Sequence, residues 1–213
     1  MSPDTRRLAG LYVLTDTPSE PATLLPRVAA VLRGGASVIQ YRDKSGFPAQ
    51  RRAEAEAIRA LCQRHGAIFI VNDDPALAAE VGADGVHLGR SDMSLAEARR
   101  IVGAKAIIGI SCYDSLDRAR SAAAEGANYV AFGSIYPSAT KPEAVPAPLS
   151  LLTQAKRQLA LPLVAIGGIS AGNAAPVIAA GADALAVISS VFLAADPEAE
   201  ARRLATLFPA RQR

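Results

Sequence analysis

Tryptophan, cysteine and histidine are scarce in this sequence. Its 213 residues include no tryptophan, two cysteines and two histidines. Cys62 and Cys112 lie far apart, belong to no CxxC motif and have no cluster of histidines beside them. Neither a disulfide framework nor a thiolate zinc site is therefore expected. The sequence predicts two free thiols in a reducing compartment.

Long apolar runs and mixed basic and aromatic runs are also missing. No segment approaches the length of a transmembrane helix, and no signal-peptide-like apolar stretch follows Arg6 and Arg7. The net charge is +3, but the basic residues gather near the chain ends or in helical pairs such as Arg51 and Arg52. We therefore expect a cytoplasmic protein that binds neither membranes nor nucleic acid.

Apolar residues make up 50% of the chain, which is enough for the core of one large domain. No linker and no change in composition divides the sequence. We predict one domain over residues 1–213, with short basic extensions at residues 1–8 and 209–213.

A Gly-Ala-polar-x-aliphatic pattern recurs along the chain, starting at Gly35, Gly82, Gly126 and Gly181. Each copy follows an Ala-rich helical segment and precedes a short apolar run, as expected for a helix that ends at glycine before a strand. Four further apolar runs lie at residues 11–14, 68–71, 107–110 and 163–166. Eight short strands alternating with helices predict an α/β fold, a (β/α)8 TIM barrel. An open doubly wound sheet is the alternative, but no GxGxxG motif follows any of these strands.

Cationic side chains gather at the end of the strand predicted over residues 38–44. With a period of two, Gln40, Arg42 and Lys44 project to one side of this strand. A guanidinium and an ammonium group together suit the oxygens of a phosphorylated ligand. The alternative is a solvated strand end whose charges pair with Asp43 and Glu54.

Several polar residues at strand ends are not needed as helix caps. Asp74 and Ser94 fit the N-cap positions of the helices after the third and fourth strands, which leaves Asp73 and Asp92 without that role. Ser111 is likewise spare after the fifth strand. Two carboxylates on neighbouring strands could share Mg²⁺, which prefers carboxylate and phosphate oxygens. A surface or turn position is the alternative for each aspartate taken alone.

Glycine and hydroxyl groups follow the last three strands. Gly167 and Gly168 after the seventh strand, with Ile188 and Ser189 after the eighth, fit a backbone phosphate site. The loop over residues 133–149 is the longest connection and contains Lys141, which suits a lid that closes on a substrate. His87 has no second metal ligand nearby, so we interpret it as a hydrogen-bonded structural residue of the barrel.

In combination these motifs resemble the thiamine phosphate synthase family, and the resemblance extends from Leu11 to about Phe192. The motifs are Gln40-x-Arg42-x-Lys44, Asn72-Asp73, Gly85-Val86-His87-Leu88-Gly89 with Asp92, Gly109-Ile110-Ser111, Ser138-x-Thr140-Lys141-Pro142 and Gly167-Gly168. Such enzymes couple a hydroxymethylpyrimidine diphosphate to a thiazole phosphate and release pyrophosphate. The resemblance implies a dissociative reaction that depends on Mg²⁺. One departure from the family pattern is Arg90, where glutamine is frequent.

The resemblance also implies a role for each matching residue. The pyrimidine diphosphate would be bound by Gln40, Arg42, Lys44, Asn72, Ser111 and Lys141. The thiazole phosphate would be bound by Ser138, Ala139, Thr140, Gly168, Ile188 and Ser189. The Mg²⁺ ligands would be Asp73 and Asp92, and the groups acting in catalysis would be Arg42, Lys44, Ser111 and Lys141.

Two other functions fit the same barrel. A thiazole tautomerase would share the thiazole phosphate site, but related tautomerases tend to keep a histidine just after the fifth strand. Here that segment is Ser111-Cys112-Tyr113. A non-catalytic barrel that binds phosphorylated ligands would need neither the aspartate pair nor a lysine in the lid. The sequence leaves open a homo-oligomer, a carboxylated thiazole substrate and the conformation of the loop over residues 133–149.

Overall fold

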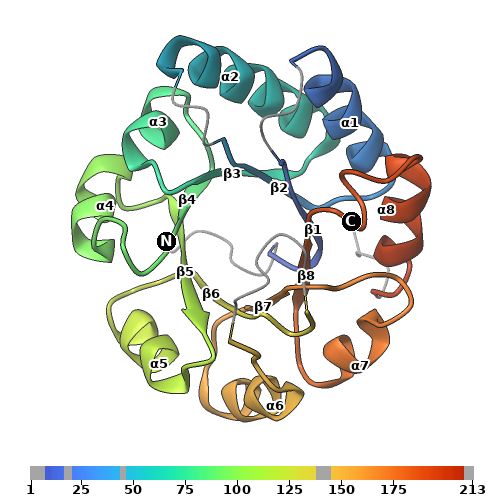
Figure 1. Ribbon diagram of the computed structural model, residues 1–213. Helices are drawn as coiled ribbons and strands as arrows, with labels where there is room; N and C mark the ends of the chain where they lie inside the picture. Colours follow the sequence, from blue (N-terminus) through green and yellow to red (C-terminus); the bar gives the residue numbers. More distant parts are fainter. Residues whose placement is uncertain (1–7, 17–20, 44–46, 138–144, 209–213) are drawn as a thin grey trace.

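The chain folds into a closed barrel of parallel strands surrounded by helices (Figure 1). This computed structural model describes residues 8–16, 21–43, 47–137 and 145–208. The strands are β1 (Gly10–Leu14), β2 (Val38–Tyr41), β3 (Ile68–Asn72), β4 (Gly85–Leu88), β5 (Ile107–Tyr113), β6 (Tyr129–Phe132), β7 (Leu163–Ile166) and β8 (Ala184–Val187). The helices are α1 (Pro21–Arg33), α2 (Pro48–His65), α3 (Pro75–Glu80), α4 (Leu95–Val102), α5 (Leu116–Ala124), α6 (Leu149–Gln158), α7 (Ala174–Ala179) and α8 (Pro197–Ala205).

The predicted (β/α)8 barrel is confirmed. Each strand pairs with the next in sequence, and β8 closes the barrel on β1. Strand alternation divides the core into two layers. In β1, Leu11 and Val13 pack outward against the helices, whereas Tyr12 and Leu14 belong to a second apolar cluster inside the barrel. No helix in the part of the chain that the structure describes is both long and apolar enough to cross a membrane.

The glycine repeat joins neighbouring strands at the amino end of the barrel. Its glycines all have a positive φ, which permits the turn into the next strand: Gly35, Gly82, Gly126 and Gly181. In three copies, the polar residue of the repeat bonds one residue of the preceding strand through both its side chain and its N–H, at 2.8 to 2.9 Å. These pairs are Asp84 with Phe69, Asn128 with Ile108, and Asp183 with Leu163. The repeat therefore supports the end of the barrel opposite the loops that carry the predicted site residues.

The two predicted helix caps are confirmed. Asp74 accepts from the N–H of Leu77, and Ser94 forms a capping box with Glu97. Helix α6 instead follows Pro148 at its N-cap position, without a side-chain cap. Proline can precede that helix because its ψ of 151° is extended and proline needs no N–H there.

Candidate active site

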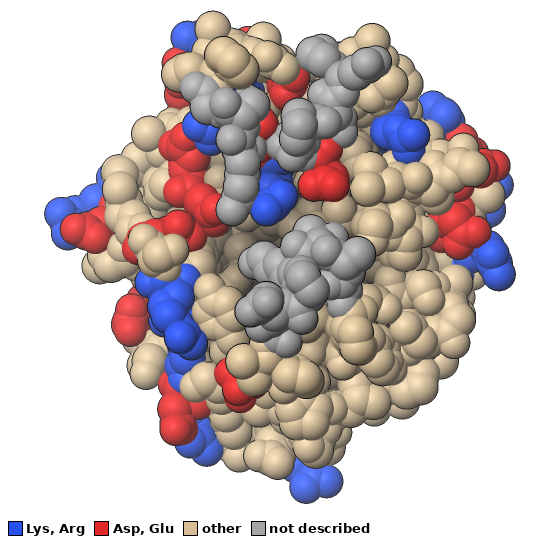
Figure 2. Space-filling model, in the orientation of Figure 1, with Lys and Arg blue, Asp and Glu red and all other residues tan. Residues whose placement is uncertain are grey.

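The barrel contains a cavity of about 700 Å³ lined by residues at the carboxyl ends of the strands. Aliphatic side chains, including Leu14, Val164 and Ile166, form part of its wall. Charged side chains surround the hollowed face over α2 to α5, whereas the surface over α7 is largely uncharged (Figure 2). The cavity thus suits a ligand that has both an apolar part and a charged part.

Four residues predicted to bind the pyrimidine diphosphate meet at this cavity: Gln40, Arg42, Asn72 and Ser111 all line it. The regular strand β2 ends at Tyr41, earlier than the strand predicted over residues 38–44. Alternation still directs Gln40 and Arg42 to the cavity, while Tyr41 packs outward. Thr15 holds the backbone here, because its hydroxyl accepts from the Arg42 N–H at 2.9 Å and lies 3.2 Å from the Arg42 carbonyl.

A chain of hydrogen bonds crosses the interior of the barrel. Gln40 Nε2 donates to Tyr12 Oη over 2.8 Å, and Tyr12 Oη lies 2.9 Å from Tyr129 Oη. His87 Nδ1 is 2.8 Å from Tyr129 Oη, and His87 Nε2 is 2.8 Å from Ser111 Oγ. Burial raises the pKa of Tyr12 and of Tyr129 above the ordinary tyrosine value, so both phenols keep their protons at neutral pH.

These hydrogen bonds change the interpretation of His87 and Ser111. His87 is hydrogen-bonded, as expected, but it also lines the cavity and contacts a predicted site residue. Ser111 caps no helix, as expected, yet its hydroxyl is engaged by that histidine. Sequence reasoning missed Tyr12 and Tyr129 entirely. The only sign of them in the sequence is a polar aromatic residue at an inward-facing position of each strand, where the other inward-facing residues are small or aliphatic.

The two predicted metal ligands lie on neighbouring strand ends. Asn72 pairs with His87 across β3 and β4, and the Asn72 amide donates to the Asp73 carboxylate at 2.6 Å. Asp73 is exposed and has a φ of 61°, a conformation that aspartate tolerates better than most residues. Asp92 accepts from the N–H of Gly89 at 2.6 Å and is half-buried.

Neither carboxylate lines the cavity of about 700 Å³ directly, and no cluster of three or more His, Cys, Asp or Glu side chains suited to a metal occurs in the described ranges. Two carboxylates leave most coordination positions to water and substrate oxygens. Mg²⁺ usually binds in this way, so the donor set fits that ion. Shared binding by Asp73 and Asp92 stays a prediction.

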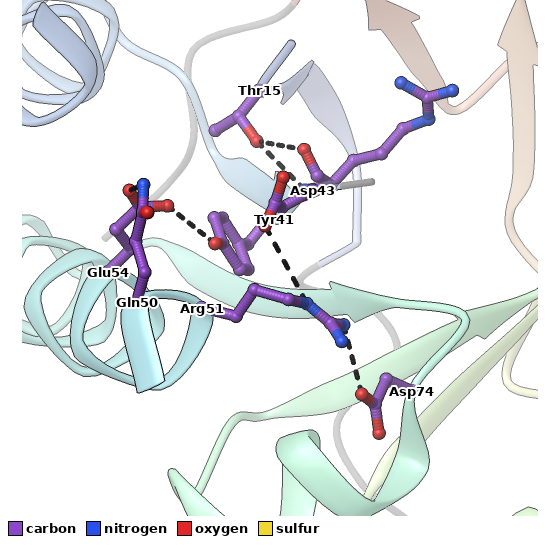
Figure 3. Close-up of polar contacts among 8 residues, drawn as sticks. Thr15, Tyr41, Asp43, Gln50, Arg51, Glu54 and Asp74 are labelled. Atoms are coloured by element: carbon purple, nitrogen blue, oxygen red, sulfur yellow. Dashed lines mark hydrogen bonds and ion pairs between the residues drawn. The ribbon is translucent and has the colours of Figure 1, made fainter. Parts of the chain in front are cut away.

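Helix α2 supports the loops after β2 and β3 (Figure 3). Arg51 Nη2 lies 3.0 Å from Asp74 Oδ2, and Arg51 Nε lies 3.9 Å from Asp43 Oδ2. On the outer side of β2, the Tyr41 hydroxyl donates to Glu54 at 2.6 Å. Asp43 therefore faces Arg51 of α2, and Glu54, which lies on α2, accepts from Tyr41. Arg42 Nη1 lies 3.6 Å from Asp16 Oδ1.

A second, smaller cavity of about 320 Å³ lies beside β7 and β8. It is lined by three of the residues predicted to bind the thiazole phosphate: Gly168, Ile188 and Ser189. Ile188 borders both cavities. At Gly168, φ is 59° and a β-carbon would collide with the backbone of Tyr136 and Pro137. A glycine is therefore required there by close packing against the sixth loop.

Arg90 lies at the rim of the larger cavity. Its guanidinium carbon is 4.9 Å from the centre of the Tyr113 ring, and the backbone N–H of Arg90 donates to the Tyr113 hydroxyl at 3.2 Å. Tyr113 has a φ of 55°, which is unusual for a bulky residue. The arrangement adds a positive charge next to the loop that carries Asp92.

Five predicted site residues lie outside the described ranges: Lys44, Ser138, Ala139, Thr140 and Lys141. The flanking residues Asp43, Pro137 and Val145 are described. Pro137 lines the smaller cavity and Val145 the larger one. The sixth loop therefore approaches both cavities at its two described ends.

Comparisons with known proteins support the resemblance found in the sequence. The family model described as thiamine monophosphate synthase matches residues 11–191. Thiamine-phosphate synthase from Thioalkalivibrio sulfidiphilus is 62% identical over 203 residues, which are 95% of this chain and 96% of that protein. The corresponding protein from Thiobacillus denitrificans is 56% identical, over 94% of this chain and 95% of that protein. The structure of thiamine phosphate pyrophosphorylase from Pyrococcus furiosus has a TM-score of 0.86 and 35% identity, covering 95% of this chain and 96% of that one.

Proposed function

The chain belongs to the thiamine monophosphate synthase family, and we propose that it couples a pyrimidine diphosphate to a thiazole phosphate. It is an enzyme of the transferase class that acts in thiamine biosynthesis. The proposed substrates are 4-amino-2-methyl-5-(diphosphooxymethyl)pyrimidine and the phosphate of the hydroxyethyl thiazole. The proposed products are thiamine monophosphate and pyrophosphate.

The observation that carries this proposal is the pair of adjoining cavities that share Ile188. The larger cavity combines an apolar wall with Gln40, Arg42, Asn72 and Ser111, which suits a ring that bears a diphosphate. The smaller one offers backbone N–H groups beside Gly168 and the Ser189 hydroxyl, which suit a monophosphate. Two phosphorylated substrates could thus lie next to each other.

In the proposed reaction the carbon–oxygen bond of the pyrimidine methylene breaks and pyrophosphate leaves with the bonding electrons. The thiazole nitrogen then attacks the methylene carbon and forms the new carbon–nitrogen bond. Arg42, with Lys44 and Lys141, would stabilise the negative charge that develops on the leaving group. A magnesium ion held by Asp73 and Asp92 would supply further positive charge to the diphosphate.

No nucleophile from the protein is needed for this reaction. Cys112, which follows Ser111, is buried, and burial raises the pKa of its thiol to about 12. Burial raises the pKa of the Cys62 thiol to about 12 as well. Both cysteines therefore remain protonated at neutral pH. Buried, unpaired thiols also support the proposal that the enzyme works in the cytoplasm on small-molecule substrates.

Pyrophosphate release, measured with both substrates and Mg²⁺, tests the function directly. We expect release only when both substrates are present, together with one thiamine monophosphate formed per pyrophosphate. Isomerisation of a thiazole phosphate without pyrophosphate release would favour the tautomerase alternative. Binding of both ligands without turnover under any Mg²⁺ concentration would favour a non-catalytic barrel.

A further inference from the structure

Five strands contribute to the hydrogen-bond chain inside the barrel, and its direction can be worked out. Gln40 is on β2, Tyr12 on β1, Tyr129 on β6, His87 on β4 and Ser111 on β5. Tyr12 and Tyr129 are almost fully inaccessible to solvent, at 1% and 0% exposure. Water therefore has little access to their hydroxyl groups, and the side chains must satisfy one another.

The side-chain amide of Gln40 sets the direction of the hydrogen bonds. An amide NH₂ can only donate, so the Gln40 Nε2 bond occupies Tyr12 Oη as an acceptor and the Tyr12 proton points to Tyr129. Tyr129 then accepts from Tyr12 and has one proton left. The described acceptor for that proton is His87 Nδ1, at 2.8 Å.

Assigning one proton to each bond in the same way determines the tautomer of His87 and the role of the Ser111 hydroxyl. With Nδ1 acting as acceptor, His87 is neutral and carries its proton on Nε2, which donates to Ser111 Oγ. The Ser111 hydroxyl accepts that bond and keeps its own proton. At the other end of the chain, Gln40 uses its NH₂ group on Tyr12, so its carbonyl oxygen remains available.

We propose that Tyr12, Tyr129 and His87 are positioning residues that fix Gln40 as a carbonyl acceptor and Ser111 as a hydroxyl donor toward the cavity ligand. Reversing one bond would reverse the whole chain, because each link has one proton. The hydrogen-bond chain therefore discriminates between ligands by the pattern of donors and acceptors on their ring edge. This inference rests on the proposed function for the identity of the ring, but its direction rests on the side chains alone.

An aminopyrimidine edge has an amino donor next to a ring-nitrogen acceptor. The 4-oxo analogue presents the opposite pattern, with a carbonyl acceptor next to a ring N–H donor. A fixed Gln40 carbonyl favours the amino donor and opposes the oxo group. A site built to bind one such pattern discriminates strongly against its reverse, since a mismatch leaves buried polar groups unpaired.

The tautomer of His87 tests the direction without any substrate. The chain has two histidines, and His65 is exposed at the end of α2, so it serves as an internal reference in nitrogen NMR spectra. We expect neutral His87 with its proton on Nε2 in the unliganded protein at neutral pH. In Tyr129→Phe the preference should weaken toward a mixture of tautomers. A proton on Nδ1, or an imidazolium at neutral pH, would overturn the inferred direction.

The selectivity of binding tests the consequence for ligands. Calorimetry would compare the 4-amino pyrimidine diphosphate with its 4-oxo analogue in the wild type, Tyr12→Phe and Tyr129→Phe. Loss of either hydroxyl lets the Gln40 amide rotate, so we expect the amino-to-oxo preference to fall at least roughly tenfold, the factor that corresponds to one hydrogen bond.

Tyr41→Phe is the matched control, because Tyr41 is also buried but its hydroxyl bonds Glu54 outside the barrel. The preference should be unchanged in this variant, and thermal unfolding would verify that each variant folds. Equal weakening of both ligands in Tyr12→Phe and Tyr129→Phe, or no preference in the wild type, would overturn the inference. A wild type that shows the preference but releases no pyrophosphate would instead overturn the proposed function alone.

Discussion

Arg51 Nη2 lies 3.0 Å from Asp74 Oδ2, so one arginine of α2 holds the residue next to a predicted metal ligand. The same guanidinium faces Asp43 at 3.9 Å, next to the predicted diphosphate ligand Lys44. Arg51 thereby joins the loops after β2 and β3 behind the candidate site (Figure 3). The Asp43 side chain is 2% exposed, which makes its charge costly to leave without compensation.

Removing Arg51 should lower the stability of the fold and raise the Mg²⁺ concentration that the reaction requires. We expect Arg51→Ala to lower the free energy of unfolding by about 1.5–3 kcal/mol, which is typical for hydrogen bonds to charged groups. It should also raise the Mg²⁺ concentration needed for half-maximal coupling, because the loop bearing Asp73 loses its support. Urea unfolding and a Mg²⁺ titration of the coupling rate would measure the two effects.

Arg52→Ala is the matched control on the same helix. Arg52 bonds Glu56 and Glu80 at 3.0 and 2.8 Å, but these pairs are exposed and contribute little. Both quantities should stay close to wild type in this variant. If Arg51→Ala and Arg52→Ala behaved alike, Arg51 would have no positioning role.

The sequence was sufficient to predict the barrel and part of the site because both depend on local periodicity. Alternation along β2 correctly directed Gln40 and Arg42 to one side. The glycine repeat predicted helix ends, and its glycines do adopt the positive φ that such ends require. Cap chemistry separated Asp74, which caps α3, from Asp73, which does not.

Relationships between distant strands could not be predicted in this way. Tyr12 and Tyr129 are 117 residues apart, and their hydrogen bond exists only because the barrel brings β1 and β6 to a common interior. In the sequence each looks like a core aromatic. Arg51 and Arg52 likewise appear equivalent as a helical pair, yet one faces the site loops and the other faces solvent. Contacts of this kind depend on packing, which local patterns do not encode.

Lys141 should matter more for chemistry than for binding. It lies outside the described residues, in a proline-flanked loop whose described ends approach both cavities. We expect Lys141→Ala to reduce the single-turnover rate more than it weakens thiazole phosphate binding, because leaving-group charge appears late in the reaction. Rapid-quench kinetics would measure the rate, with Lys105→Ala as an exposed control between α4 and β5. An unchanged single-turnover rate with a higher thiazole KM would show that Lys141 does not act on the leaving group.

Gly168→Val should weaken thiazole phosphate binding. The new side chain would collide with Tyr136 and Pro137 and would require a strained φ, so the backbone at the smaller cavity must shift. We expect the Kd for the thiazole phosphate to rise by roughly 10- to 100-fold, as for the loss of a hydrogen bond to a charged group. Pyrimidine diphosphate affinity should change little. Gly172→Val is the control, at an exposed glycine where a β-carbon would meet only the Ser170 hydroxyl, in ordinary contact at 3.9 Å. Equal losses for both ligands would mean that the two half-sites are assigned wrongly.

The aspartate pair gives the sharpest test of the proposed metal site. Asp73→Asn and Asp92→Asn should each raise the Mg²⁺ requirement and reduce the coupling rate. Asparagine keeps an oxygen that can still accept from Asn72 or from the N–H of Gly89, so these variants remove charge with little change in local structure. The loss could reach about 100-fold, or about 3 kcal/mol, as when one electrostatic stabiliser of a developing charge is removed.

If the two carboxylates hold one ion, their effects cannot be independent. The double variant should lose much less activity than the product of the two single losses, because residues that act as a unit are not additive. Asp117→Asn serves as the control, since its side chain is 88% exposed on α5, where it pairs with Arg120. Coupling rates across a Mg²⁺ series would be measured for all four variants. Two small, additive effects with an unchanged Mg²⁺ requirement would identify Asp73 and Asp92 as separate surface carboxylates. The diphosphate would then depend on Arg42 and the two lysines for its charge stabilisation.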